Sequence, residues 1–319
     1  MTIATRRVGF RRLSEIIDLH VARLPSELRS ETRDELLRKN KCGLIDLGHS
    51  RIVVERKRII AWLLVEKHAD SSWHFHLPET DSGDQKSLES EQIRRRLLTD
   101  LRADFDDGRG WIAQSLLTQD QVHDADLLSE CGFYALTGLQ FMTRVSDRDP
   151  PAVPTGDWQV ESWTQERDGQ FAAAIERTYE GTRDCPELNG SRTGQQALTS
   201  HTLSGIFDPK LWRVYSHNGD DVGIALLSPH SDNSGTDSAE SKSEQQVWEI
   251  VYVGVAALHR NRGLAKRMLA DMLQLAREGG ASEVMLGVDV RNEPAIRLYE
   301  QFGFRLFDRR RVHARLRRR

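Results

Sequence analysis

Residues 247–269 read VWEIVYVGVAALHRNRGLAKRML, an apolar run, a cationic turn with one glycine, and an amphipathic segment. The run 247–258 is long and rich in β-branched residues, which predicts a buried strand. After the turn, apolar side chains recur at helical spacing on one face: Met268, Leu269, Met272, Leu273 and Ala276. A strand is therefore expected to pass directly into a helix, and Gly279-Gly280 is expected to end that helix.

The turn between these elements has the makings of an anion site. Gly263 stands where the first amide groups of the helix have no partner within the helix. Unpaired amides and the positive end of the helix dipole favour a negative ligand, and a glycine lets the backbone approach it closely. Arg260 and Arg262 can add positive charge. An ordinary solvated turn is the alternative, because short motifs recur by chance.

The surroundings of the turn favour the first interpretation. The arrangement YVGVAALHRNRGLAKRML followed by LGVDVRNEPAIRLYEQFGF resembles the GNAT acetyltransferase superfamily, specifically over residues 247–306 and loosely over 157–246. Arg260, Gly263 and Ala265 match its pyrophosphate signature, [QR]-x-x-G-x-[GA]. The resemblance implies that acetyl-CoA binds here, with its pantetheine arm paired to the strand and its diphosphate on the turn. The implied cofactor-binding residues are Val253, Gly254, Val255, Arg260, Asn261, Arg262, Gly263, Leu264, Ala265, Lys266 and Asn292.

Acetyl transfer to an amine poses two proton problems. An alkylamine with a pKa near ~10 must lose a proton, and the departing thiolate benefits from gaining one. The resemblance places Tyr299 at the position of the general acid, although a half-buried aromatic on an amphipathic helix is the alternative. Glu249, in the otherwise apolar stretch WEIVYVGV, is the candidate base. It can instead be a structural or substrate-orienting acid, or a simple surface acid.

The acceptor side is expected in RTYEGTRDCPELNG, residues 177–190, because the superfamily builds its acceptor wall between its first two helices. The candidate substrate-binding residues, which would suit a cationic amine, are Tyr179, Glu180, Asp184 and Glu187. A solvated acidic loop is the alternative. Cys185 has no histidine close in sequence to activate it, which argues against an acyl-carrying nucleophile.

The order of strands and helices repeats in the two halves of the chain when Gly132 is aligned with Gly303. We therefore predict an α/β (α+β) protein of two tandem GNAT-like domains, each a mixed, mostly antiparallel sheet flanked by helices. The predicted boundaries are a degenerate domain over 1–147, a proline-rich linker over 148–156 and a catalytic domain over 157–319. The first half has no R-x-x-G-x-A turn, and Leu128 and Gln121 stand where the second half has Tyr299 and Asn292. It is expected to serve packing or to shape the acceptor cleft.

Composition narrows the remaining choices. The net charge of −3 indicates no nucleic-acid partner, and the eight arginines from Arg305 onward fit a closing strand with solvated cations. No segment is apolar enough to span a membrane or act as a signal peptide, and three scattered cysteines offer no metal-ligand spacing. We expect a cytoplasmic, metal-free N-acetyltransferase that uses acetyl-CoA and a small-molecule or peptide amine. A non-catalytic acyl-CoA-binding or regulatory module is the alternative.

Overall fold

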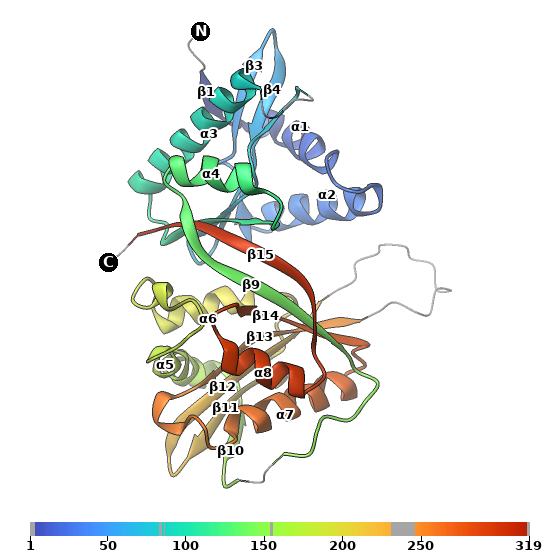
Figure 1. Ribbon diagram of the computed structural model, residues 1–319, viewed down its shortest axis with the longest axis vertical. Helices are drawn as coiled ribbons and strands as arrows, with labels where there is room; N and C mark the ends of the chain where they lie inside the picture. The colour runs from blue at the N-terminus through green and yellow to red at the C-terminus, as the bar shows by residue number, and fades with distance from the viewer. Residues whose placement is uncertain (1–3, 83–84, 86, 154–155, 231–245, 318–319) are drawn as a thin grey trace. The chain divides into compact units, whose positions relative to one another are not determined.

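Figure 1 shows the computed structural model, which describes residues 4–82, 85, 87–153, 156–230 and 246–317. The chain divides into two compact units: unit 1 comprises residues 1–136 and 311–319, and unit 2 comprises residues 137–310. Residues 154–155 of the predicted linker and residues 231–245 lie outside the described residues. None of the described helices combines the length and the apolar character that crossing a membrane requires.

Unit 2 contains a mixed sheet in the order β10-β11-β12-β13-β14-β9. All neighbouring pairs are antiparallel except β13 and β14. The strands are β9 (Tyr134–Val145), β10 (Gln159–Ser162), β11 (Trp212–His217), β12 (Asp220–Pro229), β13 (Val247–Val255) and β14 (Glu283–Asp289). The register between β12 and β13 shifts at Leu226/Leu227, which is the signature of a β-bulge. The strand predicted from the run 247–258 is thus present as β13.

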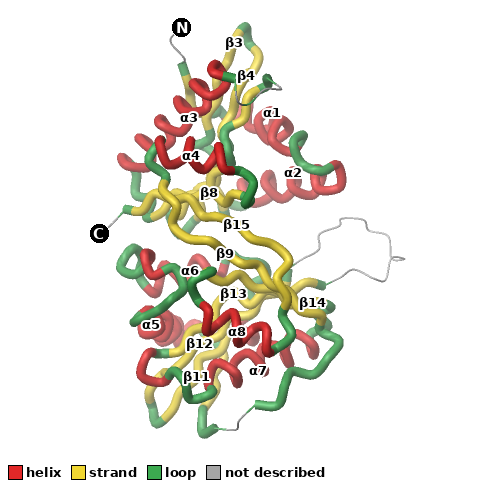
Figure 2. Tube along the Cα trace, viewed as in Figure 1, coloured by secondary structure: helices red, strands yellow, loops and turns green. Residues whose placement is uncertain are grey.

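Helices surround this sheet (Figure 2). They are α5 (Asp168–Tyr179), α6 (Gly194–Thr202), α7 (Leu264–Glu278) and α8 (Glu293–Gln301). Two glycines show how closely α5 and α7 approach the strands. A Cβ on Gly254 would lie 2.7 Å from the side chain of Thr178 in α5, and one on Gly223 would lie 2.9 Å from the sulfur of Met268 in α7. In the β12–β13 ladder, Gly223 pairs with Val255, the residue next to Gly254. Because successive residues of a strand point to opposite faces, Gly223 and Gly254 face opposite sides of the sheet, and so α7 and α5 cover opposite faces.

In its described residues, unit 1 has four helices and strands from two sheets. One sheet has the order β1-β3-β4-β7, and the other contains β2, β5, β6 and β8 together with residues 311–316 of β15 (Arg305–Leu316). The other strands are β1 (Thr5–Arg7), β2 (Ile45–Asp46), β3 (Arg51–Glu55), β4 (Arg58–Leu63), β5 (Val65–His68), β6 (Ser72–Phe75), β7 (Glu79–Thr80) and β8 (Ile112–Leu117). The helices are α1 (Phe10–Val21), α2 (Ser26–Lys41), α3 (Leu88–Asp107) and α4 (Val122–Glu130).

The division into units differs from the predicted boundaries at both strand ends. Residues 139–145 of β9, placed by sequence in the first domain, pair with β14 in unit 2. Residues 311–316 of β15, placed in the second domain, pair with β8 in unit 1. The two halves of the chain have therefore exchanged their last strands. A hydrophobic alternation predicts which face of a strand is buried but not which neighbour the strand pairs with.

Candidate active site

The central feature of unit 2 is a cavity of about 970 Å³ where β13 and β14 separate. The two strands pair in parallel over three residues only, ending at Glu249 opposite Met285. Beyond that point β13 stays paired with β12 on its other side. Ile250–Val255 of β13 and Leu286–Val288 of β14 then line opposite sides of the cavity. The strands thus leave a slot between them. An extended ligand lying in this slot can form hydrogen bonds to the backbone of β13, as an added strand does.

The start of α7 closes one end of this slot. Gly263 is the N-cap with φ +86°, a left-handed conformation that glycine adopts without strain, and no side chain caps the helix. Residues 259–266 all line the cavity. The amides of the first turn therefore open toward the cavity without a side-chain acceptor, in the geometry that binds anions. Every residue predicted to contact the cofactor lines this one cavity.

Arg260 has a different set of partners from those we expected. Its guanidinium donates to four backbone carbonyls, at distances of 2.6–3.0 Å: Val255, Gly181, Thr178 and Glu180. Arg262 and Lys266, by contrast, are exposed and form no ion pair with any residue that the structure describes. The positive charge available to a ligand at this helix start thus comes from Arg262 and Lys266, together with the helix dipole.

Helix α8 brings the predicted acid to the same cavity. Asn292 is its N-cap and accepts a hydrogen bond from the Ala295 amide, as its position in the sequence predicted. Tyr299, later in the same helix, lines the cavity and packs edge-on against Phe304. Burial, with the negative charge of Asp184, raises the pKa of Tyr299 above its ordinary value. The phenol therefore keeps its proton at neutral pH.

Of the four predicted wall residues, Asp184 lies on the cavity and the other three, all described, are absent from its lining. Tyr179 packs against the hydrophobic core of unit 2. Glu180 offers its carbonyl to Arg260, and Glu187 forms an ion pair with Arg291. Of these four, Asp184 is thus the residue that lines the cavity.

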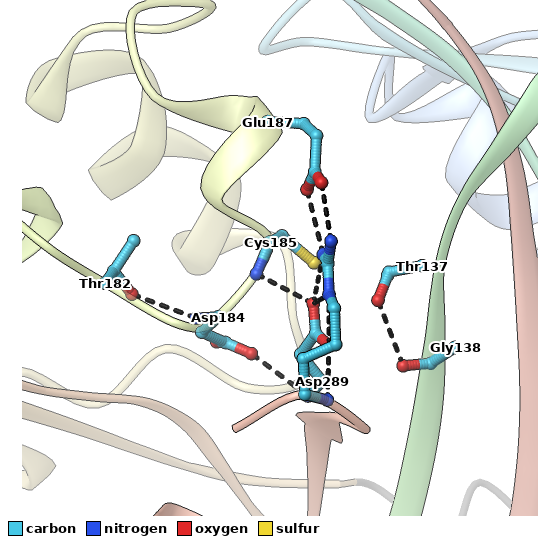
Figure 3. Close-up of polar contacts among 8 residues, drawn as sticks. Thr137, Gly138, Thr182, Asp184, Cys185, Glu187 and Asp289 are labelled. Carbon is cyan, nitrogen blue, oxygen red and sulfur yellow. Dashed lines mark hydrogen bonds and ion pairs between the residues drawn. The ribbon is translucent and has the colours of Figure 1, made fainter. Parts of the chain in front are cut away.

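Asp184 is held against the end of β14 (Figure 3). Its Oδ1 accepts from the Asp289 amide at 3.0 Å, and the Cys185 amide donates to Oδ2 of Asp289 at 3.0 Å. Burial raises the pKa of Asp184 above its usual range, although the Asp289 amide opposes the rise. Asp289 is fully buried, and burial disfavours its charge. Hydrogen bonds from Arg291 outweigh that effect and lower the pKa of Asp289 to about 2.

Asp184, Cys185 and Asp289 bring three donor groups within 4.8 Å of one another. Both oxygens of Asp289 are already bonded to Arg291, and Oδ1 of Asp184 to an amide. Burial raises the pKa of the Cys185 thiol, so the sulfur remains protonated. These contacts pin the loop to β14, and a protonated thiol is a poor nucleophile and a poor ligand.

Glu249 lies where β13 and β14 part, with its side chain partly buried. Its Oε2 is 2.8 Å from Nε2 of His230, a residue that no pattern in the sequence singles out. Glu249 is outside the lining of the cavity, all of whose residues the structure describes. A proton passed between Glu249 and a ligand in the cavity would therefore travel through an intervening group such as water.

Comparisons with known proteins agree with this geometry. A model of the acetyltransferase (GNAT) family matches residues 175–304. Mycothiol acetyltransferase from Acidothermus cellulolyticus is 28% identical over 158 residues, which cover 49% of this chain and 47% of the relative. Another mycothiol acetyltransferase, from Thermobispora bispora, is 33% identical over 98 residues, 31% of each chain. The chain thus matches about half the length, or less, of these curated relatives.

Solved structures match over nearly the whole chain. A GCN5-related N-acetyltransferase from Sphaerobacter thermophilus has a TM-score of 0.63 at 19% identity, covering 99% of this chain and 96% of that one. A tandem GNAT protein from the clavulanic acid biosynthesis pathway has a TM-score of 0.55 at 14% identity, covering 99% and 98%. These matches establish the tandem fold. The match to the acetyltransferase (GNAT) family itself lies in the second half of the chain.

Proposed function

We propose that the chain is an acetyl-CoA-dependent N-acetyltransferase that acetylates a primary amine by direct transfer in a ternary complex. The observation that carries the proposal is the cavity in which the free edge of β13, the uncapped start of α7 and Tyr299 meet. The extended, amide-containing arm of the donor would pair with β13, its diphosphate would lie at the start of α7, and its sulfur would lie near Tyr299. Holding donor and acceptor together there would supply much of the rate by proximity.

On the donor side, the amides of Gly263–Lys266 would hold the diphosphate, with Arg262 and Lys266 adding charge. Val253, Gly254 and Val255 would pair with the pantetheine arm through their backbone, as an added strand does. Asn292 fixes the start of α8 and so the placement of Tyr299. The phenol of Tyr299 would then deliver a proton to the departing sulfur.

On the acceptor side, Asp184 is the carboxylate that opens onto the cavity, and its charge acts on Tyr299. We assign it to binding the cationic form of the amine before transfer. Glu249, paired with His230, would take the proton through water. Asp184 would thus position the amine, and Glu249 would accept its proton.

The first half would have no catalytic role. Its helix α3, the counterpart of α7, is capped by the Ser87 hydroxyl and carries Glu89 and Glu91 in its first turn. A capped, acidic helix start repels a diphosphate. Leu128, at the position that Tyr299 occupies in the second half, is fully buried and has no proton to give. Packing and shaping the acceptor cleft remain as its proposed roles.

The test is release of free CoA when the protein meets acetyl-CoA and pooled primary amines, with the acetylated product identified by mass. Because the curated relatives are named mycothiol acetyltransferases, thiol-bearing amines belong in the panel beside amino sugars, polyamines and peptide N-termini. Amine-dependent release supports the proposal. Binding of acetyl-CoA without any amine-dependent release would favour the acyl-CoA-binding module, and no binding at all would refute both.

A further inference from the structure

We propose that Arg260 is a positioning residue, which fixes the acceptor-side wall against the donor-binding strand, and that it is not a ligand of the diphosphate. The wall segment is defined here as residues 178–187, which connect the end of α5 to the contacts on β14. This inference rests on the proposed function for its role in the reaction. The hold that Arg260 has on the wall is a property of the free protein and can be tested without any ligand.

The first support is the saturation of the Arg260 side chain. A guanidinium has five N–H donors, and four of them are used on carbonyls: Nε on Val255, Nη1 on Gly181, and Nη2 on Thr178 and Glu180. The last carbonyls of a helix lack partners within it, and a cation there also suits the helix dipole. Arg260 therefore caps the end of α5 and has at most one donor left for a phosphate.

The second support is the seat of Thr178 on β13. Its hydroxyl lies 2.6 Å from the hydroxyl of Tyr252, and any Cβ at Gly254 would collide with it. The end of α5 thus rests directly on the strand that would carry the pantetheine arm. Arg260 completes this contact by linking Val255, the last residue of β13, to the carbonyls of the wall.

The third support is that the other end of the wall is fastened separately. The Asp289 amide holds Asp184, and Arg291 holds Glu187 through hydrogen bonds of 2.5 and 2.9 Å (Figure 3). The wall is therefore tied to β13 by Arg260 and to β14 by Asp289 and Arg291. Releasing the Arg260 end frees the segment that carries Asp184 while leaving the amides at the start of α7 in place.

The experiment compares Arg260→Lys, Arg260→Gln and the matched control Arg262→Gln. Lysine keeps the charge but cannot reach four carbonyls in a fork. In the free protein, both Arg260 variants should speed amide hydrogen exchange in residues 178–187 by about tenfold or more. Arg262→Gln should leave that exchange unchanged and weaken acetyl-CoA binding by about tenfold. Arg260→Lys should bind acetyl-CoA within about threefold of the unmodified protein.

In turnover with the best amine of the panel, Arg260→Lys should raise the KM for the amine about tenfold and leave the KM for acetyl-CoA nearly constant. Wild-type exchange in the wall of Arg260→Lys would overturn the inference. So would loss of acetyl-CoA affinity in Arg260→Gln that Arg260→Lys restores, because charge alone would then explain the residue. Should Arg260→Gln fail to fold, amide exchange in the wall of Arg260→Lys decides the inference. If the unmodified protein does not bind acetyl-CoA, the proposed function fails. The exchange comparison still measures whether Arg260 holds the wall in place.

Discussion

Gly263 determines how α7 begins and what its first amides face. At φ +86° it starts α7 and leaves the first-turn amides open to the cavity. An aspartate there would place a negative charge on the anion site, so Gly263→Asp should lower acetyl-CoA affinity by more than about 100-fold. Gly263→Asn is the matched control, because asparagine tolerates the left-handed conformation and has the same size without the charge. Calorimetry on folded proteins should give a much smaller loss for asparagine; equal, undiminished affinity in both would refute the anion site.

Glu249 and Tyr299 should affect turnover more than binding. Glu249→Gln keeps shape and hydrogen bonding but removes basicity, so turnover should fall about 10²-fold and the acidic limb of the pH profile should move or vanish. Tyr299→Phe should lower turnover by about tenfold or more, because only the proton donor is lost. Tyr134→Phe removes an exposed hydroxyl in unit 1 and should change neither turnover nor acetyl-CoA binding. Wild-type rates across pH in both site variants would make the two residues structural.

Residue identities near the site could be predicted where the signal is local. The signature turn, the N-cap Asn292 and the position of Tyr299 each depend on neighbours a few positions away. Three of the four partners of Arg260 could not, because they are backbone carbonyls about 80 positions earlier and carry no side-chain signature. The same holds for His230, which contacts Glu249 from 19 positions earlier in the chain.

At the scale of elements, unit 1 should lose stability in acid through histidines on α1 and β6. Burial lowers the pKa of His20 to about 3, with His76 adding to the effect, and that of His74 to about 4, with His68 adding. Glu66, hydrogen-bonded to His76, pulls the other way. In the unfolded chain both histidines titrate near 6.5. The unfolded state therefore binds more protons below pH 6.5, and stability falls as the pH drops from there toward 4.

Each of these histidines should contribute a slope of about 1.4 kcal/mol per pH unit in that range. Urea unfolding at pH 7 and pH 5 measures it, followed by fluorescence of the buried Trp62 and Trp73 in unit 1. His74→Gln, which retains a polar side chain near Gln114, should flatten the dependence. A stability of the unmodified protein that does not change between the two pH values would contradict buried, neutral histidines.

Turn residues mark some element boundaries directly. The Asn218-Gly219 pair separates β11 from β12, and both residues have positive φ, as hairpin turns require. The run 51–67 reads as one strand but forms β3, β4 and part of β5. Its first turn places Arg56 and Lys57 at φ +45° and +71°. Neither residue favours that conformation, so the pairing of the two strands imposes it against local preference.

At the scale of the whole molecule, the tandem plan was readable because each half repeats the same order of elements. The exchange of last strands was not, because β9 and β15 have alternating patterns that suit either sheet. Strands of similar pattern suit the same position in a sheet, and tertiary pairing selects between them. Truncating the chain after residue 310 would thus remove a strand from unit 1, although the sequence assigns it to the second half.

We propose that one acetyl-CoA site exists per chain, between β13 and β14 of unit 2. Calorimetric titration of the full chain with acetyl-CoA measures this directly. We predict a stoichiometry of one, abolished by Gly263→Asp and unaffected by Ser87→Ala at the corresponding helix start of unit 1. Two equivalent sites, or a single site that survives Gly263→Asp in a folded protein and is lost in Ser87→Ala, would contradict the claim.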